Sequence, residues 1–304
     1  MSLSEIVRAL GGDLYDGDTR ANVPGPGHRP DDRSVSLLYE NGRIVAHCFG
    51  KGDWREVLDD LRARGLIDAE NRPTGRAATP AVRVTRAVAS RLDRIEAARR
   101  IWDLGGPIQR TLAETYLRRR AITRTLPGPD VARFVLEAPV FAYGGRGPTR
   151  PALVVAISDR DGHLSGVEIN YLAPNGRRAQ DLRLPRKTVG SAPASSAVRI
   201  DAPADHMVVA EGFPTTLSAS ERFDLPGWAL LSTRNLRSWI APLGVRSVLV
   251  AGDRGVDGEA SANLLCQRLT QQGVAAEPVF PETPDGDWND VAVAAARRGA
   301  PRLL

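Results

Sequence analysis

Apolar runs and helical segments alternate regularly in the last third of the chain. The short apolar runs, which have the length of buried strands, lie at 207–210, 228–231, 247–251 and 275–280. The segments with helical spacing of apolar residues lie at 215–222, 235–240, 258–271 and 290–297. Strands that alternate with helices at this spacing predict a parallel sheet covered by helices on both faces. We therefore predict an α/β domain at 201–304.

The first part of the chain has a different, α+β pattern. The spacing of apolar residues predicts helices at 4–10 and 54–61. It predicts strands at 34–39 and 43–49. The two strands are joined at Asn41-Gly42, and Asn-Gly between β-forming residues is a strong hairpin signal. We predict a small unit with its own core at 1–66.

A linker is expected between this unit and the middle of the chain. Residues 67–82 are rich in Asn, Pro, Thr, Gly, Arg and Ala, a composition typical of connecting segments. Beyond it, helices are expected at 87–104 and from 111 onward, and strands at 151–157, 164–171 and 197–200. We predict a second α+β unit at 83–200.

Two of the predicted C-terminal strands end at a carboxylate. Glu211 and Gly212 follow the first strand, and Asp253 follows the third. Because the carboxyl ends of neighbouring parallel strands meet at one edge of the sheet, Glu211 and Asp253 are expected to face the same crevice. Carboxylate and water oxygens are the ligands that Mg²⁺ prefers. The pattern therefore predicts a metal site at this edge.

Composition and charge indicate the kind of partner and the cellular compartment. The chain has 304 residues, a formal net charge of +5 and only two cysteines, Cys48 and Cys266. The mild positive charge fits a polyanionic partner, and nearly all of it is Arg, which reflects either a GC-rich coding sequence or selection for phosphate contacts. Two distant cysteines describe no disulfide framework and favour the cytoplasm. No apolar run approaches the roughly 20 residues that span a bilayer, so no membrane partner is expected.

Three motifs of the C-terminal domain together resemble the Toprim domain, which is shared by bacterial primases, topoisomerases, some nucleases and recombination proteins. Glu211-Gly212 with Thr215-Thr216-Leu217 is similar to its first motif. Asp253 and Gly258 match the second motif, in which Gly255 replaces a second aspartate. Asp287-Trp288-Asn289-Asp290 is similar to an element common in primase-like members.

The resemblance implies roles for the acidic residues. Glu211 would act as the acid/base, and Mg²⁺ or Mn²⁺ would be held by Glu211, Asp253, Asp257, Asp287 and Asp290. Gly255 leaves one carboxylate fewer, and Asp257 either takes that place or caps the following helix. Asp287 to Asp290 either support the metal or start a helix, with Asp287 or Asn289 as its cap.

A helix in the middle unit resembles the basic subdomain of bacterial primases. The run from Tyr116 to Ile122 is similar to the family pattern Tyr-Leu-x-x-Arg-Gly-Ile, except at Ala121. The resemblance implies contacts with single-stranded DNA by Tyr116, Arg118, Arg119, Arg120, Arg183, Arg186 and Lys187. The alternative is a set of solvated charges that complement a helix end or protect a sheet edge.

The first unit is similar to the small zinc-binding domain that precedes the catalytic part of primases. His28 lies in a Pro/Gly turn, and His47-Cys48 lie on the second strand of the hairpin. Gly25 and Lys51-Gly52 stand where thiolates would be expected, so the four ligands of a structural zinc site are not assembled. Neighbouring residues on a strand also point to opposite faces. We predict a degenerate zinc-ribbon-like unit that is held by its core and binds no zinc.

The order of these units implies a DNA primase-like protein of a phage, plasmid or other mobile element. Such a protein would bind single-stranded DNA and nucleoside triphosphates and make a primer by Mg²⁺-dependent nucleotidyl transfer. Two alternatives stay open, a non-catalytic Toprim protein that binds nucleic acid and a Toprim nuclease. The chain contains no Gly-x-x-x-x-Gly-Lys-Ser/Thr stretch, so a replicative helicase partner is expected to be a separate polypeptide.

Overall fold

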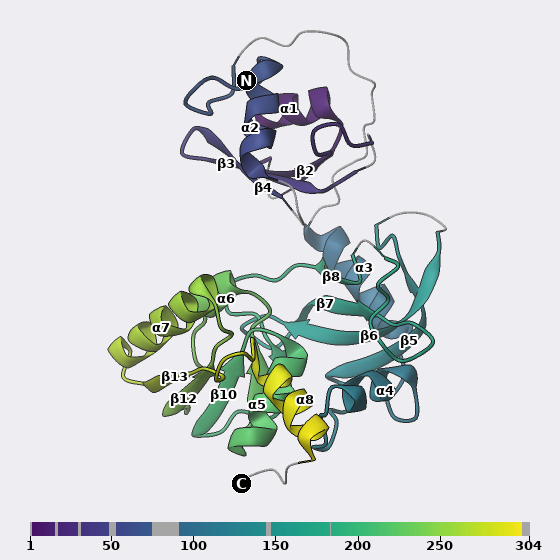
Figure 1. The fold of residues 1–304 in the computed structure, drawn as a ribbon, viewed down its shortest axis with the longest axis vertical. Coiled ribbons are helices and arrows are strands. Elements are labelled where there is room, and N and C mark those ends of the chain that lie inside the picture. The colour runs from purple at the N-terminus through teal and green to yellow at the C-terminus, as the bar shows by residue number, and fades with distance from the viewer. Residues whose placement is uncertain are drawn as a thin grey trace. The chain divides into compact units, whose positions relative to one another are not determined.

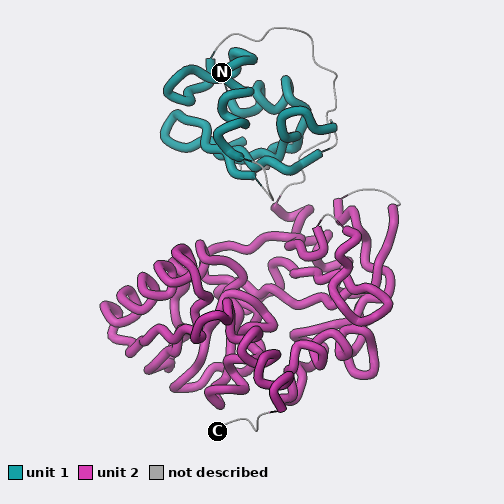
Figure 2. Tube along the Cα trace, in the orientation of Figure 1, with its two compact units in different colours: residues 1–90 teal, residues 91–304 magenta. Residues whose placement is uncertain are grey.

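The structure is a computed structural model that describes residues 2–15, 18–29, 32–48, 53–74, 91–143, 147–182 and 184–299. The chain divides into two compact units, unit 1 at 1–90 and unit 2 at 91–304 (Figure 2). Among the described residues, no helix is both long enough and apolar enough to cross a bilayer.

Unit 1 is a four-stranded antiparallel sheet with two helices packed on one face. The elements are α1 (Leu3–Leu10), β1 (Asp13–Tyr15), β2 (Arg20–Val23), β3 (Val35–Glu40), β4 (Arg43–Cys48) and α2 (Trp54–Ala63), and the strand order is β1-β2-β3-β4. The predicted hairpin is present, with Asn41 and Gly42 both at positive φ between β3 and β4. Ile67 is buried in the same core, so unit 1 extends beyond the boundary predicted at residue 66.

The turn around His28 is held by hydrogen bonds to Asp32. The Asp32 carboxylate accepts from the backbone N–H of Gly25 at 3.1 Å, and its Oδ2 lies 2.9 Å from Nδ1 of His28. Burial opposes ionisation, but hydrogen bonds from Ser34, Gly25 and His28 outweigh it and hold the pKa of Asp32 below its usual range. Sequence reasoning overlooked this network, and whether zinc binds stays a prediction.

The first half of unit 2 is an antiparallel sheet between two helices. The elements are α3 (Arg91–Asp103), α4 (Leu112–Arg119), β5 (Ala132–Pro139), β6 (Thr149–Ser158), β7 (Leu164–Tyr171) and β8 (Arg186–Gly190), in the strand order β5-β6-β7-β8. Alternate residues of β6 enter different cores, because Val154 packs in the cluster that contains α3 whereas Val155 packs in the cluster that contains α4.

The second half of unit 2 confirms the predicted α/β sheet. Its elements are β9 (Val198–Arg199), β10 (His206–Ala210), α5 (Phe213–Phe223), β11 (Gly227–Ala229), α6 (Thr233–Ser238), β12 (Ser247–Ala251), α7 (Val256–Gln271), β13 (Ala275–Val279) and α8 (Trp288–Arg298). The strand order is β13-β12-β10-β11-β9, and only β9 is antiparallel to its neighbour.

Helices cover both faces of this C-terminal sheet (Figure 1). Val208 and Ala210 of β10 pack with residues of α5 and α8, whereas Met207 and Val209 pack with residues of α6 and α7. One core cluster contains Leu153 of β6 together with Phe213 of α5. The two predicted domains at 83–200 and 201–304 therefore share a core.

The residue after the C-cap of α4 has an uncommon backbone conformation. Ala121 lies in the left-handed region with φ 56°, at the position where the primase pattern has glycine. A side chain in this region costs roughly 1–2 kcal/mol, which glycine avoids. Glycine also gives the unfolded chain more freedom, and this offsets part of the gain.

We predict that Ala121→Gly raises the free energy of unfolding by about 0.5–1 kcal/mol, measured by urea denaturation. The matched control is Ala260→Gly, on the exposed face of α7. It should lower the free energy of unfolding by about 1 kcal/mol, because its backbone is helical. Equal destabilisation by both substitutions would contradict the prediction.

Candidate metal centre

Glu211 and Asp253 follow adjacent parallel strands. Ala210 at the end of β10 is in register with Ala251 at the end of β12, so both residues lie at one sheet edge, as predicted. The connection from β10 leads to β11 and that from β12 leads to β13, in opposite directions across the sheet. Such a reversal opens a crevice at the carboxyl ends of the strands, where α/β sheets bind ligands.

Glycines let the segments after these strands approach closely. A Cβ atom at Gly258 would lie 2.5 Å from the backbone oxygen of Asp253, so only glycine lets α7 start against this turn. A Cβ atom at Gly252 would lie 2.5 Å from the Phe280 ring. The glycine of the second motif is therefore a packing requirement.

The third motif contributes the start of α8. Asp287 is the N-cap, and its Oδ1 accepts from the backbone N–H groups of Asn289 and Asp290 at 2.7 and 2.8 Å. The backbone N–H of Arg254 donates to the carbonyl of Gly286 at 2.8 Å, which joins this segment to the turn after Asp253. Asp287 therefore both caps a helix and adds a negative charge near Asp253.

Asp253 is the most perturbed carboxylate of the edge. Its Oδ1 is buried and has no hydrogen-bond partner in the described part of the chain. Burial, followed by the charges of Asp287, Glu211 and Asp290, raises the pKa of Asp253 to about 7, and Arg186 opposes the rise. A buried carboxylate oxygen without a partner, surrounded by other carboxylates, fits a bound divalent cation.

Glu211 is perturbed in the same direction. Burial raises the pKa of Glu211, Asp257 and Glu168 add to the rise, and Arg186 again opposes it. A carboxyl group with a raised pKa is a candidate for acid/base work.

The carboxylates at this edge do not form a tight cluster. Over the described ranges, the group of three candidate ligands whose atoms lie within 4.8 Å of one another is Asp159, Asp161 and His163, in the turn between β6 and β7. There, Asp159 Oδ1 accepts from the backbone of Asp161 and His163, a local turn that needs no ion. The edge around Asp253 is more open than a closed structural site.

Asp257 and Gly255 differ from what the sequence suggested. Asp257 is exposed and paired with Arg237, and it does not cap α7, whose N-cap is Gly255. The backbone of Gly255 has φ 116° and ψ 159°, a region that essentially only glycine occupies. The missing second aspartate is thus accompanied by a backbone conformation that an aspartate does not readily adopt.

Glu168 of β7 was missed by sequence reasoning. It is only 3% exposed and accepts from Nδ2 of Asn170 at 3.0 Å, and its Oε2 lies 4.0 Å from Nε of Arg186. The register of β7 and β8 places Arg186 opposite Asn170, on the same sheet face as Glu168. A glutamate between the apolar Val167 and Ile169 was the available signal, because a buried carboxylate is costly without a role.

Tyr116 does not offer the predicted stacking surface. Its side chain is 3% exposed and belongs to the core shared by both halves of unit 2. The guanidinium of Arg120 lies 5.1 Å above its ring, and Arg178 donates to its hydroxyl at 3.3 Å. The interpretation of Tyr116 as a base-stacking residue is therefore wrong, since an apolar ring near the end of an amphipathic helix is a core residue here.

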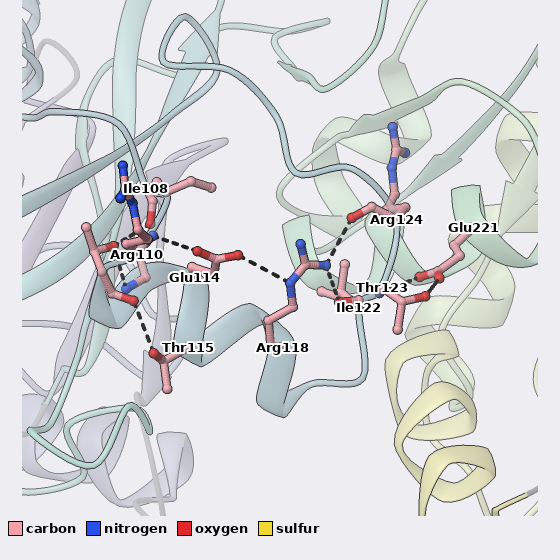
Figure 3. A network of polar contacts seen from close by, with 11 residues as sticks. Ile108, Arg110, Glu114, Thr115, Arg118, Ile122, Thr123, Arg124 and Glu221 are labelled. Atoms are coloured by element: carbon pink, nitrogen blue, oxygen red, sulfur yellow. Dashed lines mark hydrogen bonds and ion pairs between the residues drawn. The ribbon is translucent and has the colours of Figure 1, made fainter.

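The three consecutive arginines have different surroundings. Arg118 pairs with Glu114 and donates to the carbonyls of Ile122 and Arg124 at 2.9 and 3.0 Å, as Figure 3 shows. Arg120 donates to Oδ1 of Asn289 at 2.5 Å. Arg119 is exposed. Arg118 and Arg119 are therefore both exposed, and the side chains of Arg118 and Arg120 are engaged in contacts within the protein.

Arg186 and Lys187 lie on opposite faces of the sheet. Arg183 lies outside the described residues, and Arg186 faces the acidic edge. Lys187 points to the opposite face of the sheet, where Nζ donates to the carbonyl of Val140 at 2.6 Å and lies 5.3 Å from the Tyr171 ring. Burial lowers the pKa of Lys187 to about 8. Arg186 and Lys187 therefore cannot contact one strand of DNA together from this sheet.

The C-terminal part combines a mostly parallel sheet with carboxylates at one edge. The family model of the Toprim domain matches residues 206–298, and a domain of unknown function, DUF7146, matches residues 92–200. Residues 206–298 are therefore assigned to the Toprim domain. No curated protein sequence matches it significantly.

Several solved primase structures align with this chain. The zinc-binding and RNA polymerase domains of Aquifex aeolicus primase align at 15% identity and a TM-score of 0.46, over 98% of this chain and 82% of that one. The primase fragment of the bacteriophage T7 primase-helicase aligns at 14% and 0.39, over 57% and 67%. The RNA polymerase domain of Mycobacterium tuberculosis primase aligns at 17% and 0.41, over 69% and 83%.

Ionisation of Asp253 should make the free energy of unfolding of the metal-free protein depend on pH. Its folded pKa of about 7 lies above the ordinary value of 3.8, so its contribution to stability is present below about pH 4 and is lost as the pH rises through 7. In EDTA, Asp253→Asn should remove this loss and raise the free energy of unfolding at pH 8 by about 1–2 kcal/mol. Thermal unfolding from pH 5 to 8 measures the effect. The exposed Asp130→Asn is the control, and a pH profile equal to that of wild type in both variants would refute the assignment.

Restoring the family aspartate should strain the turn before α7. We predict that Gly255→Asp lowers the free energy of unfolding by about 1–3 kcal/mol, because its backbone is in a glycine region. The control is Gly128→Asp, at an exposed glycine with open space and no positive φ, which should change stability by less than about 0.5 kcal/mol. Urea denaturation compares the two, and equally small effects would contradict the strain argument.

Proposed function

We propose that this chain is a primase-like enzyme that binds single-stranded DNA and joins nucleoside triphosphates in a Mg²⁺- or Mn²⁺-dependent reaction. The observation that supports it best is the buried, unpartnered oxygen of Asp253 among Glu211, Asp287 and Asp290 at the switch point of the Toprim sheet. An edge of this kind has the charge and the position to receive a metal-bound triphosphate.

The acidic residues divide into two roles. Asp253, with Asp287 and Asp290, would hold the divalent metal, which supplies positive charge to phosphate oxygens when it is bound. Glu211 is the general base that we assign to the proton of the attacking hydroxyl group, because its pKa is raised by burial. Asp257 is a weaker candidate ligand, since it is paired with Arg237.

The proposal of a DNA template rests on the resemblance of the motif order and on the cations near the edge. Arg186 lies on the sheet face that meets the acidic edge, and Arg119 is exposed at the end of α4. Both are suited to phosphate contacts. In this proposal the protein acts in the cytoplasm in the replication of a phage, plasmid or other mobile element, with any replicative helicase as a separate chain.

A second candidate is a nucleic-acid-binding Toprim protein without turnover. Gly255 favours it, because one expected carboxylate is missing and the backbone there suits only glycine. The open spacing of the carboxylates points the same way, since no three of them lie within ligand distance of one another among the described residues.

Primer synthesis separates the two candidates. On a single-stranded DNA template with Mg²⁺ or Mn²⁺, wild type should incorporate labelled ribonucleotides. Glu211→Gln should reduce the rate by about 100-fold or more, because the acid/base is lost, and Asp253→Asn should do the same through metal binding. DNA affinity, measured by fluorescence anisotropy, should change less than about threefold in either variant.

The matched control is Glu282→Gln, at an exposed glutamate of the same domain, which should retain the wild-type rate. DNA binding without incorporation by wild type would favour the non-catalytic protein. Cleavage of the template, lost in Glu211→Gln, would instead indicate a nuclease.

A further inference from the structure

The side chain of Asn289 joins three helices. It belongs to the first turn of α8 and is 1% exposed. Its Nδ2 donates to the carbonyl of Arg120 at 2.8 Å and to Oγ of Ser218 at 2.9 Å, and its Oδ1 accepts from Nη1 of Arg120 at 2.5 Å. The amide thus binds both the backbone and the side chain of Arg120, at the end of α4.

Arg120 is held from a second side. It is the C-cap residue of α4, and its guanidinium lies 5.1 Å above the buried ring of Tyr116. The middle part of unit 2 therefore presents a guanidinium and a carbonyl in fixed positions. Asn289 satisfies both groups, and leaving them unpaired would be costly.

Backbone hydrogen bonds and adjacent residues connect this contact to the acidic edge. Asn289 lies between Asp287 and Asp290 in the sequence, and its own backbone N–H donates to the Asp287 carboxylate at 2.7 Å. The carbonyl of Gly286 accepts from the backbone of Arg254, next to Asp253, at 2.8 Å. A displacement of Asn289 would therefore move the start of α8 relative to Asp253.

We propose that the contact between Arg120 and Asn289 positions Asp287 and Asp290 against Asp253 and thereby sets the affinity of the site for divalent metal. The inference rests on the proposed function in taking this edge as the metal site. Arg120 and Asn289 are positioning residues, because their polar groups are engaged with each other. Arg120, which the family resemblance assigns to DNA, has here a role in the metal site.

A role that is only structural would lower stability and leave metal affinity unchanged. Removal of groups that orient metal ligands commonly weakens metal binding by 10- to 100-fold. Arg120→Ala removes the guanidinium contact and keeps the backbone carbonyl of Arg120, whereas Asn289→Ala removes both contacts. Because the two substitutions share the guanidinium contact, their losses should not add.

The test is a titration of the full chain with Mn²⁺, followed by electron paramagnetic resonance. Arg120→Ala and Asn289→Ala should each weaken Mn²⁺ binding by about 10-fold, and the double variant should be no weaker than the more affected single variant. The controls are Arg297→Ala, at the exposed end of α8, and Asn263→Ala, on the exposed face of α7, which should bind Mn²⁺ like wild type.

Thermal unfolding in EDTA identifies the variants that are folded. Arg120 is partly exposed, so Arg120→Ala carries the test if Asn289→Ala does not fold. Wild-type Mn²⁺ affinity in folded Arg120→Ala would overturn this inference and leave the proposed function standing. Fully additive losses in the double variant would do the same. Absence of Mn²⁺ binding by wild type would overturn the metal site of the proposed function and the inference with it.

Discussion

Helix α5 is buried on all sides, and this constraint shapes the rest of unit 2. Its residues from Phe213 to Ser220 are all buried, although half of them carry hydroxyl groups. Phe213 and Leu217 pack in the core that includes β6 and α4, while Ala219 faces the C-terminal sheet. The hydroxyls of Thr216 and Ser220 donate to the carbonyls of Gly212 and Leu225, so small polar side chains fill the remaining space without unpaired groups. Because α5 begins directly after Glu211, the packing that joins the two sheets also fixes the position of that carboxylate.

The same packing explains why several negative charges lie close together at the acidic edge. Asp253 is buried by the turn that Gly252 and Gly258 allow, and the start of α8 adds the charges of Asp287 and Asp290. A protein selected for stability alone would place neutral side chains at such a position. Arg186 is the cation that opposes the raised pKa of both Asp253 and Glu211, and it is shared with the buried Glu168. Carboxylates in excess over cations are an arrangement expected where a divalent ion contributes the missing charge.

The sequence predicted the C-terminal part far better than the middle. Each strand and helix of the α/β sheet was expected within a few residues, because apolar runs and helical periods alternate there without interruption. β5 and β8 were missed, since the charged residues of β8, such as Arg186 and Lys187, resemble a loop. Glu211 and Asp253 were placed correctly at one edge because parallel strands align their ends. The surroundings of Tyr116, Arg120 and Asn289 could not be read from the sequence, because a contact between α4 and α8 depends on how two distant helices pack. The pattern located the carboxylates at the strand ends and missed the contacts between side chains of distant helices.

The starts of three helices explain how so many carboxylates are tolerated together. α5, α7 and α8 all begin at the carboxyl edge of the C-terminal sheet, and α5 and α7 have glycine N-caps that make no side-chain hydrogen bond. Their N-cap residues offer no side-chain acceptor to the first N–H groups, which carry partial positive charge toward the edge, and the N–H of Gly255 itself donates to Oε1 of Glu259 at 3.4 Å. In α8 the N-cap residue itself, Asp287, supplies the capping carboxylate. Gly212 and Gly255 consequently do more than permit a turn, because a capping side chain at either position would occupy N–H groups that are suited to phosphate oxygens. Gly255 therefore replaces a carboxylate that the resemblance led us to expect and leaves the start of α7 without a capping side chain at the N-cap position.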